Sequence, residues 1–271
     1  MNITNNTNNK INFGAGLNQK IKIRQFFTNT SKTENLFYNK YGICADFNEN
    51  KPLAFVNTLC ADIFEQLGKK LNISITAPPV IKVYKQNELV KNEKYINFCI
   101  PENEKLFNDD VTYPAGSIFL KDYNNLKQID EITEKMFENG KISSNHFLAM
   151  FIHEWLHSIH LDHIYSKFGY EGDCKYLSEM YPKQKNNPIH DIKFLQNKCL
   201  SKEETQIVIN ELDSYAGEKT NQYFEVFSEM FTKLICSSIS KDCKLIKNPI
   251  DLFRKTPEKL QKIVIKAFNM D

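Results

Sequence analysis

Several features that often identify a protein class are missing from this chain. Its seven cysteines are scattered, with no C-x-x-C pair, and this argues against a disulfide framework and for a reducing compartment. No apolar run reaches the ~18 residues that a membrane span needs, so we expect no membrane span. The first residues, MNITNNTNNK, lack the apolar core of a Sec-type signal peptide.

An excess of charge of one sign is also missing. The chain carries 35 basic and 33 acidic side chains, which are evenly mixed and leave a net charge of +2. Without a strip of Lys or Arg there is no footprint for a phosphate backbone. We therefore expect no nucleic-acid partner. With 41% hydrophobic and 12% aromatic residues, the 271-residue chain can build a sizeable core.

Histidine, by contrast, is concentrated in one place. Five of the six histidines lie in the segment from His146 to His163. Within it, the residues His153-Glu154-Trp155-Leu156-His157 form the pattern H-E-x-x-H. On an α-helix, residues four apart share a face, so both imidazoles can reach one metal ion. Glu154, next to the first histidine, can then act as general base on a metal-bound water, as in zinc peptidases.

The surroundings of the motif favour a long, buried helix. Apolar residues recur around it at helical spacing, and no Gly or Pro interrupts the chain from Ser143 to Phe168. Ser143 or Ser144 can cap this helix at its start, and Gly169 can end it. A helix packed against a core holds its side chains still, which a metal site requires.

The remaining patterns predict strands early in the chain and helices late, which is an α+β fold. After an Asn-rich flexible tail at 1–32 we expect one domain at 33–271, with the sheet and motif helix in 33–168, a surface insertion at 169–200 and a helical lobe at 201–271. The expected elements are a strand or hairpin at 35–47, a helix at 51–71, strands at 80–84, 95–100 and 117–121, a helix at 124–139 ended by Gly140, and helices at 201–215, from 220 or 221 to 236 and from 256 onwards.

Catalytic zinc usually has three protein ligands, and the chain offers three sources for the third. Glu225 and Glu229 lie four apart beside an aromatic helix face, so one could bind the metal while the other orients an imidazole. His163 would complete a metzincin-like spacing, but His160 takes the place of the glycine at which that helix breaks. His160 itself lies too far along the helix axis, although it could contact substrate.

Two motifs together resemble a known family. The H-E-x-x-H pattern and the sequence E-V-F-S-E-M-F at Glu225–Phe231 look like the catalytic domain of the anthrax lethal factor group of zinc metallopeptidases, which are gluzincins. The resemblance implies a zincin-like fold, with a small mixed sheet over the H-E-x-x-H helix and a helical lobe after it. It also implies that His153, His157 and Glu225 bind Zn²⁺.

By the same resemblance, Glu154 is the catalytic base and Tyr215 stabilises the oxyanion. The expected function is that of a zinc-dependent metalloendopeptidase, a hydrolase acting as a monomer on a protein or peptide substrate. An extended substrate would pair with an edge strand of the sheet, for which Gly116–Asp122 is the candidate. The compartment stays open between the cytoplasm, which free cysteines favour, and leaderless export as an effector.

Other interpretations of the same residues remain open. A metzincin-type peptidase would use His163 as third ligand, although continued helical patterning through Ile164 and Phe168 argues against the required break. The spacing of His153, His157 and His163 also matches a bacterial endoribonuclease group, in which Glu154 would be superfluous. A catalytically silent protein could retain the zincin scaffold for interaction alone.

Overall fold

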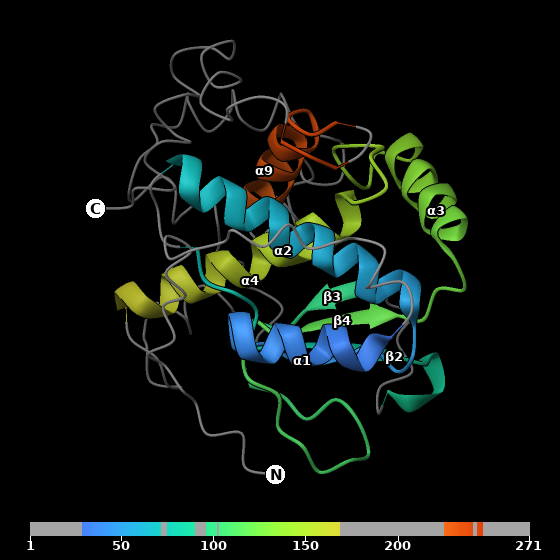
Figure 1. Ribbon diagram of the computed structural model, residues 1–271, viewed down its shortest axis with the longest axis vertical. Helices are drawn as coiled ribbons and strands as arrows, with labels where there is room; N and C mark the ends of the chain where they lie inside the picture. The colour runs from blue at the N-terminus through green and yellow to red at the C-terminus, as the bar shows by residue number, and fades with distance from the viewer. Residues whose placement is uncertain are drawn as a thin grey trace, which may run out of the picture. The chain divides into compact units, whose positions relative to one another are not determined.

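The computed structural model describes residues 29–71, 75–89, 96–101, 103–168, 225–240 and 243–245, and Figure 1 labels its helices and strands. The protein is mixed α+β. It divides into two compact units: the first comprises the chain up to Ile129 together with His157–Asp162, and the second comprises Asp130–Leu156 and the chain from His163 onwards. The expectation of a single domain at 33–271 stays a prediction.

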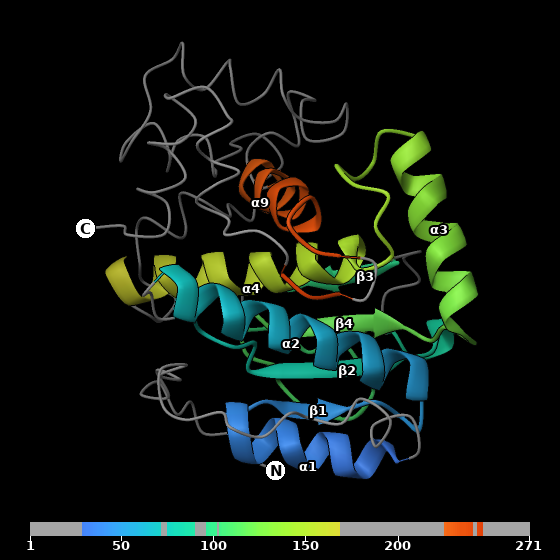
Figure 2. The ribbon, with the colours of Figure 1, turned by 45° about the horizontal axis from the view of Figure 1, so that its top comes forward.

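The first unit is built on a four-stranded sheet. Strands β1 (Cys44–Asp46), β2 (Val80–Tyr84), β4 (Ile118–Lys121) and β3 (Asn97–Cys99) follow one another in that order, as Figure 2 shows. The first three are parallel, whereas β3 is antiparallel to β4. The strands predicted at 80–84, 95–100 and 117–121 are thus confirmed, because their apolar and β-branched residues pack as buried strand surface.

The predicted substrate-pairing edge at Gly116–Asp122 is wrong. Strand β4 falls inside this segment and is paired on both sides, by β2 and by β3. Among the described strands the edges of the sheet are β1 and β3. Sequence patterns show which residues form strands but not the order of the strands, because order depends on contacts between distant segments.

An aromatic cluster fills one part of this unit. Its buried members come from β2, β4 and the loop between β3 and β4, and Phe98 of β3 packs against them. The ring of Phe119 lies 5.2 Å from that of Phe98 and 5.1 Å from that of Tyr113, centroid to centroid. These separations are typical of favourable aromatic pairs. The cluster therefore ties the antiparallel strand β3 to the parallel part of the sheet. A short 3-10 helix, η2, spans Gln86–Glu88.

Helix α1 (Thr30–Tyr41) replaces most of the strand or hairpin predicted at 35–47. That prediction is wrong except for the three residues of β1. The side chain of Asn29 accepts the backbone N–H of Lys32 and so caps the helix at its start. At its end, Gly42 adopts the left-handed conformation, with φ of 69°, which glycine allows without steric cost. Phe37 and Tyr41, which would also suit a strand, are buried on one face of the helix, whereas Tyr38 is exposed.

Helix α2 (Lys51–Leu71) confirms the helix predicted at 51–71. Asn50 precedes it, and its side chain accepts the backbone N–H of Leu53 at 2.9 Å, a typical N-cap contact. The apolar residues at helical spacing are buried, among them Leu53, Val56 and Ile63. In Figure 2, α1 lies beside β1 and α2 crosses in front of the sheet.

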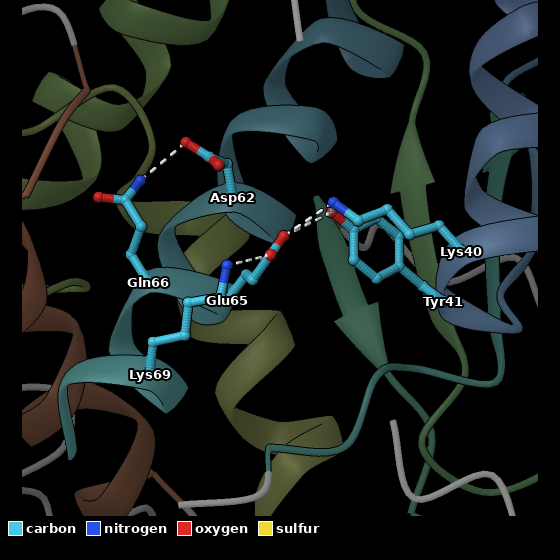
Figure 3. Close-up of polar contacts among 6 residues, drawn as sticks. All are labelled: Lys40, Tyr41, Asp62, Glu65, Gln66 and Lys69. Atoms are coloured by element: carbon cyan, nitrogen blue, oxygen red, sulfur yellow. Dashed lines mark hydrogen bonds and ion pairs between the residues drawn. The ribbon is translucent and has the colours of Figure 1, made fainter. Parts of the chain in front are cut away.

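A polar cluster joins α1 to α2 around Glu65, whose side chain is 4% exposed. Its carboxylate accepts hydrogen bonds from Lys40 Nζ at 2.8 Å, Lys69 Nζ at 2.7 Å and Tyr41 Oη at 3.3 Å, and Figure 3 shows these contacts. Burial alone would raise the pKa of Glu65, but the two lysines lower it below its usual value. Glu65 is therefore an ionised, buried link between the two helices.

Replacing Glu65 by glutamine should destabilise the fold in a pH-dependent way. We expect a loss of about 1–2 kcal/mol at pH 7, below the ~3–5 kcal/mol of a fully buried pair, because Lys69 is 37% exposed. The folded pKa of Glu65 lies below the unfolded value of 4.5. The stabilisation is therefore fully present above pH 4.5 and is lost as the pH falls through the folded pKa.

Urea unfolding of the two proteins at several pH values measures this effect. The difference in unfolding free energy between wild type and Glu65→Gln should shrink as the pH falls below 4.5. Glu134→Gln, at an exposed position of α3, serves as the control and should change stability little at any pH. A difference for Glu65→Gln that stays constant down to acidic pH would contradict this account.

Among its described residues the second unit contains most of α3 (Leu126–Glu138), the beginning and the end of α4 (Ala149–Phe168), and α9 (Val226–Cys236). The predicted helix at 124–139 is confirmed, and Gly140 ends it with φ of 61°. Helix α4 begins at Ala149 and not near Ser143. His146, rather than a serine, contacts its start, because His146 Nδ1 accepts the backbone N–H of Leu148.

The flexible tail predicted at 1–32 is wrong for its last residues, because residues 30–32 belong to α1. The rest of that tail up to residue 28, the insertion at 169–200 and the helices predicted at 201–215 and from 256 onwards lie outside the described residues. In the part of the chain that the structure describes, no helix is both long enough and apolar enough to cross a membrane.

Candidate metal centre

Helix α4 carries the H-E-x-x-H motif without interruption from Ala149 to Phe168. The residues around the motif are buried, including Phe151, Ile152 and Trp155, so the helix is packed on several sides. The side chain of His153 is 12% exposed. His157 follows one turn later on the same helix, so the two imidazoles share a face as predicted.

Helix α9 contributes two carboxylates. Glu225 directly precedes its first residue, and the backbone N–H of Glu229 donates to the Glu225 carbonyl at 2.8 Å. Both side chains are buried, at 7% exposed for Glu225 and 0% for Glu229. Both ribbon views draw α9 beside α4 (Figures 1 and 2). Burying two carboxylates side by side is costly unless each has a cationic or hydrogen-bonding partner.

His153 lies between these two carboxylates. Its Nε2 is 3.1 Å from Glu225 Oε2, and its Nδ1 is 2.8 Å from Glu229 Oε1. Each nitrogen of the ring therefore has its own acidic neighbour. A proton on Nδ1 can be donated to Glu229, and Nε2 then presents its lone pair on the side of Glu225.

Three of the predicted ligands come together at this point. One potential ligand atom from each of His153, His157 and Glu225 lies within 4.8 Å of the other two. These are the two imidazoles and the carboxylate that the H-E-x-x-H motif and the later glutamate predicted as ligands. Among the described residues, these three side chains lie close enough together to hold one metal ion.

The donor set fits zinc. Two imidazole nitrogens and one carboxylate oxygen are the ligands of many catalytic zinc sites, which keep a fourth position open. Two such ligands at ~2.0–2.1 Å from one tetrahedral ion lie about 3.3 Å apart, and the separation of His153 Nε2 from Glu225 Oε2 is 3.1 Å. Glu229, on the other ring nitrogen of His153, is the kind of partner that orients a ligating imidazole.

The electrostatics favour a cation at the same place. Burial alone would lower the pKa of His153, but the charge of Glu229, hydrogen bonds with Glu225 and Glu229, and the charge of Glu225 raise it well above its usual value. The two carboxylates thus stabilise positive charge at the ring. A divalent cation would meet the same negative field.

Comparison with known proteins assigns neither a family nor a function to this chain. No protein-family model, curated protein or solved structure matches this chain. The interpretation of this cluster as a metal centre therefore rests on its own geometry and chemistry.

Four further residues were predicted to belong to the site or to be alternatives within it. Glu154 is 8% exposed and follows His153 directly on α4. Tyr215 lies outside the described residues. His163 lies in α4, but its side chain is outside the described part, and the helix shows no break at His160 of the kind that a metzincin arrangement needs. His160 is 1% exposed, so it is an interior residue, and contact with substrate is not supported.

Ser143 has a role that the sequence does not reveal. The expectation that it caps the motif helix is wrong. Its backbone N–H donates to Glu229 Oε2 at 2.7 Å, and its Oγ donates to the Glu229 carbonyl oxygen at 2.7 Å. The two residues are 86 positions apart. No local pattern predicts this contact, because it depends on how α9 packs against the segment that precedes α4.

Proposed function

We propose that the protein is a zinc-dependent metalloendopeptidase of the gluzincin type, with the zincin-like fold that the two motifs imply. The observation that carries the proposal is the cluster of His153, His157 and Glu225, whose ligand atoms lie within 4.8 Å of one another. The position of Glu154 beside the first ligand supports a hydrolytic role in addition to metal binding.

In this proposal the ion is held by two imidazole nitrogens, from His153 and His157, and by a carboxylate oxygen of Glu225. When bound, zinc supplies a Lewis acid that polarises the scissile carbonyl and lowers the pKa of water towards neutrality. Glu229 holds His153 in the orientation and tautomer that leave a lone pair on Nε2. The packed helix α4 limits movement of both imidazoles.

Glu154 is the general base of the proposed reaction. Its carboxylate takes a proton from the attacking water as the water oxygen bonds to the scissile carbonyl carbon. It then passes that proton to the amine nitrogen as the C–N bond breaks, so one water is consumed and one acid and one amine are formed. Tyr215, the oxyanion donor that the family resemblance implies, remains part of this proposal.

An extended peptide is the substrate class that fits best. Strand β3 is at an edge of the described sheet, and an edge strand can pair with an added extended chain through backbone hydrogen bonds. This replaces β4 as our candidate for the substrate-pairing strand. Since specificity depends on side-chain pockets, the preferred cleavage sequence is a matter for experiment.

Removal of metal tests the proposal directly. The purified protein loaded with zinc should cleave casein or a peptide library, lose this activity in a chelator and regain it when zinc is restored. Mapping of new protein N-termini in a cell extract, with and without chelator, would then identify cleavage sites. Zinc bound without any cleavage would favour a silent scaffold, and a protein that binds no zinc would refute the proposal.

A further inference from the structure

The segment between α3 and α4 makes a buried contact with the metal centre. Ser143 lies in this segment and is 8% exposed, while Glu229 is 0% exposed. The two are joined twice, from the serine N–H to Glu229 Oε2 and from the serine Oγ to the Glu229 carbonyl, both at 2.7 Å. Glu229 is in turn 2.8 Å from His153 Nδ1 through its other oxygen, Oε1.

Each oxygen of the Glu229 carboxylate therefore has a separate neighbour. Oε2 faces a backbone N–H, which is always a donor and cannot change its role. Oε1 faces His153 Nδ1, which can donate or accept depending on the tautomer. The Ser143 N–H therefore holds Oε2 of Glu229. Oε1 is then in position to accept a hydrogen bond from Nδ1 of His153.

We propose that the main chain of Ser143 is a positioning element of the metal centre: its N–H fixes the Glu229 carboxylate, and Glu229 thereby holds His153 in the tautomer with hydrogen on Nδ1. This inference rests on the proposed function, because that tautomer leaves the Nε2 lone pair available to a metal. The opposite tautomer places hydrogen on Nε2, facing Glu225 at 3.1 Å, where it blocks coordination.

Replacement of Glu229 by glutamine separates this role from simple packing. The amide of Gln has nearly the same shape but only one oxygen and one NH₂ group. If the Ser143 N–H takes the oxygen, the NH₂ group must face His153 Nδ1. The ring must then accept at Nδ1 and carry its hydrogen on Nε2, which is the tautomer that cannot bind metal.

The experiment compares zinc affinity in wild type, Glu229→Gln, Glu229→Ala and Ser143→Ala, by competition with a chromophoric chelator. Loss of an outer partner typically lowers metal affinity ~10–100-fold. We expect Glu229→Gln to lose about 100-fold and Glu229→Ala only about 10-fold, since alanine leaves the ring free to choose its tautomer. Ser143→Ala keeps the N–H and should lose less than about 10-fold.

Histidine ¹⁵N chemical shifts of the metal-free Glu229→Gln protein at pH 8 give a second readout. The signal of His153 is identified by its absence after His153→Ala, and it should report hydrogen on Nε2. Hydrogen on Nδ1, or zinc bound more tightly by Glu229→Gln than by Glu229→Ala, would overturn the role of Ser143. If wild type binds no zinc, the proposed function fails, and the tautomer measurement still decides this inference.

Discussion

Substitution of Glu154 by glutamine should abolish most peptide hydrolysis and leave zinc binding intact. Glutamine cannot take a proton from the attacking water, and proton transfer by a positioned side chain typically contributes about 10²–10⁴-fold to a rate. We therefore expect kcat to fall by about that factor. Because Glu154 is not one of the three clustered ligand residues, zinc content should stay at one equivalent.

The control for this experiment is a carboxylate on an exposed helix face. Glu138→Gln, at the end of α3, makes the same chemical change at an exposed position and should retain full activity. Activity is measured as initial rates on one peptide that wild type cleaves, and zinc as metal content after gel filtration. If Glu154→Gln cleaved at the wild-type rate, Glu154 would not be the base and the peptidase mechanism would be wrong.

Substitution of Glu225 by alanine should empty the metal site. Glu225 Oε2 lies 3.1 Å from His153 Nε2, so its removal leaves two imidazoles where catalytic zinc usually has three protein ligands. We expect zinc affinity to fall by more than the ~100-fold that loss of an outer partner can cause. Peptide cleavage should be lost together with the metal.

His163→Ala is the matched comparison for this third ligand. In a gluzincin arrangement it should leave zinc content and activity near the wild-type values, since α4 continues as a helix to Phe168. Metal content is measured by elemental analysis of both variants under identical conditions. The reverse result, with His163→Ala empty and Glu225→Ala loaded, would favour the metzincin arrangement and exclude the gluzincin one.

The shared helix face of the two proposed metal ligands can be predicted from the amino-acid sequence because its geometry is local. His153 and His157 are four residues apart on a helix, and the helix period alone places them on one face. The same reasoning predicts α2 from apolar spacing and the end of α3 from Gly140. At 35–47 it fails, since aromatic residues suit both strands and helices, and the capping contact of Asn29 favours the helix.

For the proposed third ligand, spacing along the chain leaves several candidates. Glu225 and Glu229 stand out as paired carboxylates on an aromatic helix, but His163 is an alternative at the same level of reasoning. The structure places Glu225 beside one nitrogen of His153 and Glu229 beside the other. This distinction comes from the packing of α9 against α4, which spacing along the chain does not determine.

Helical periodicity is therefore enough to place two imidazoles and a neighbouring carboxylate on one buried helix, because each of these relations spans a single turn. Packing between segments far apart in the chain decides the rest. Such packing places β3 and not β4 at an edge of the sheet. It also brings Glu225 next to His153 and places Ser143 in contact with Glu229, 86 positions away. Such contacts depend on the free energy of burying whole helix and sheet faces, which no short pattern contains.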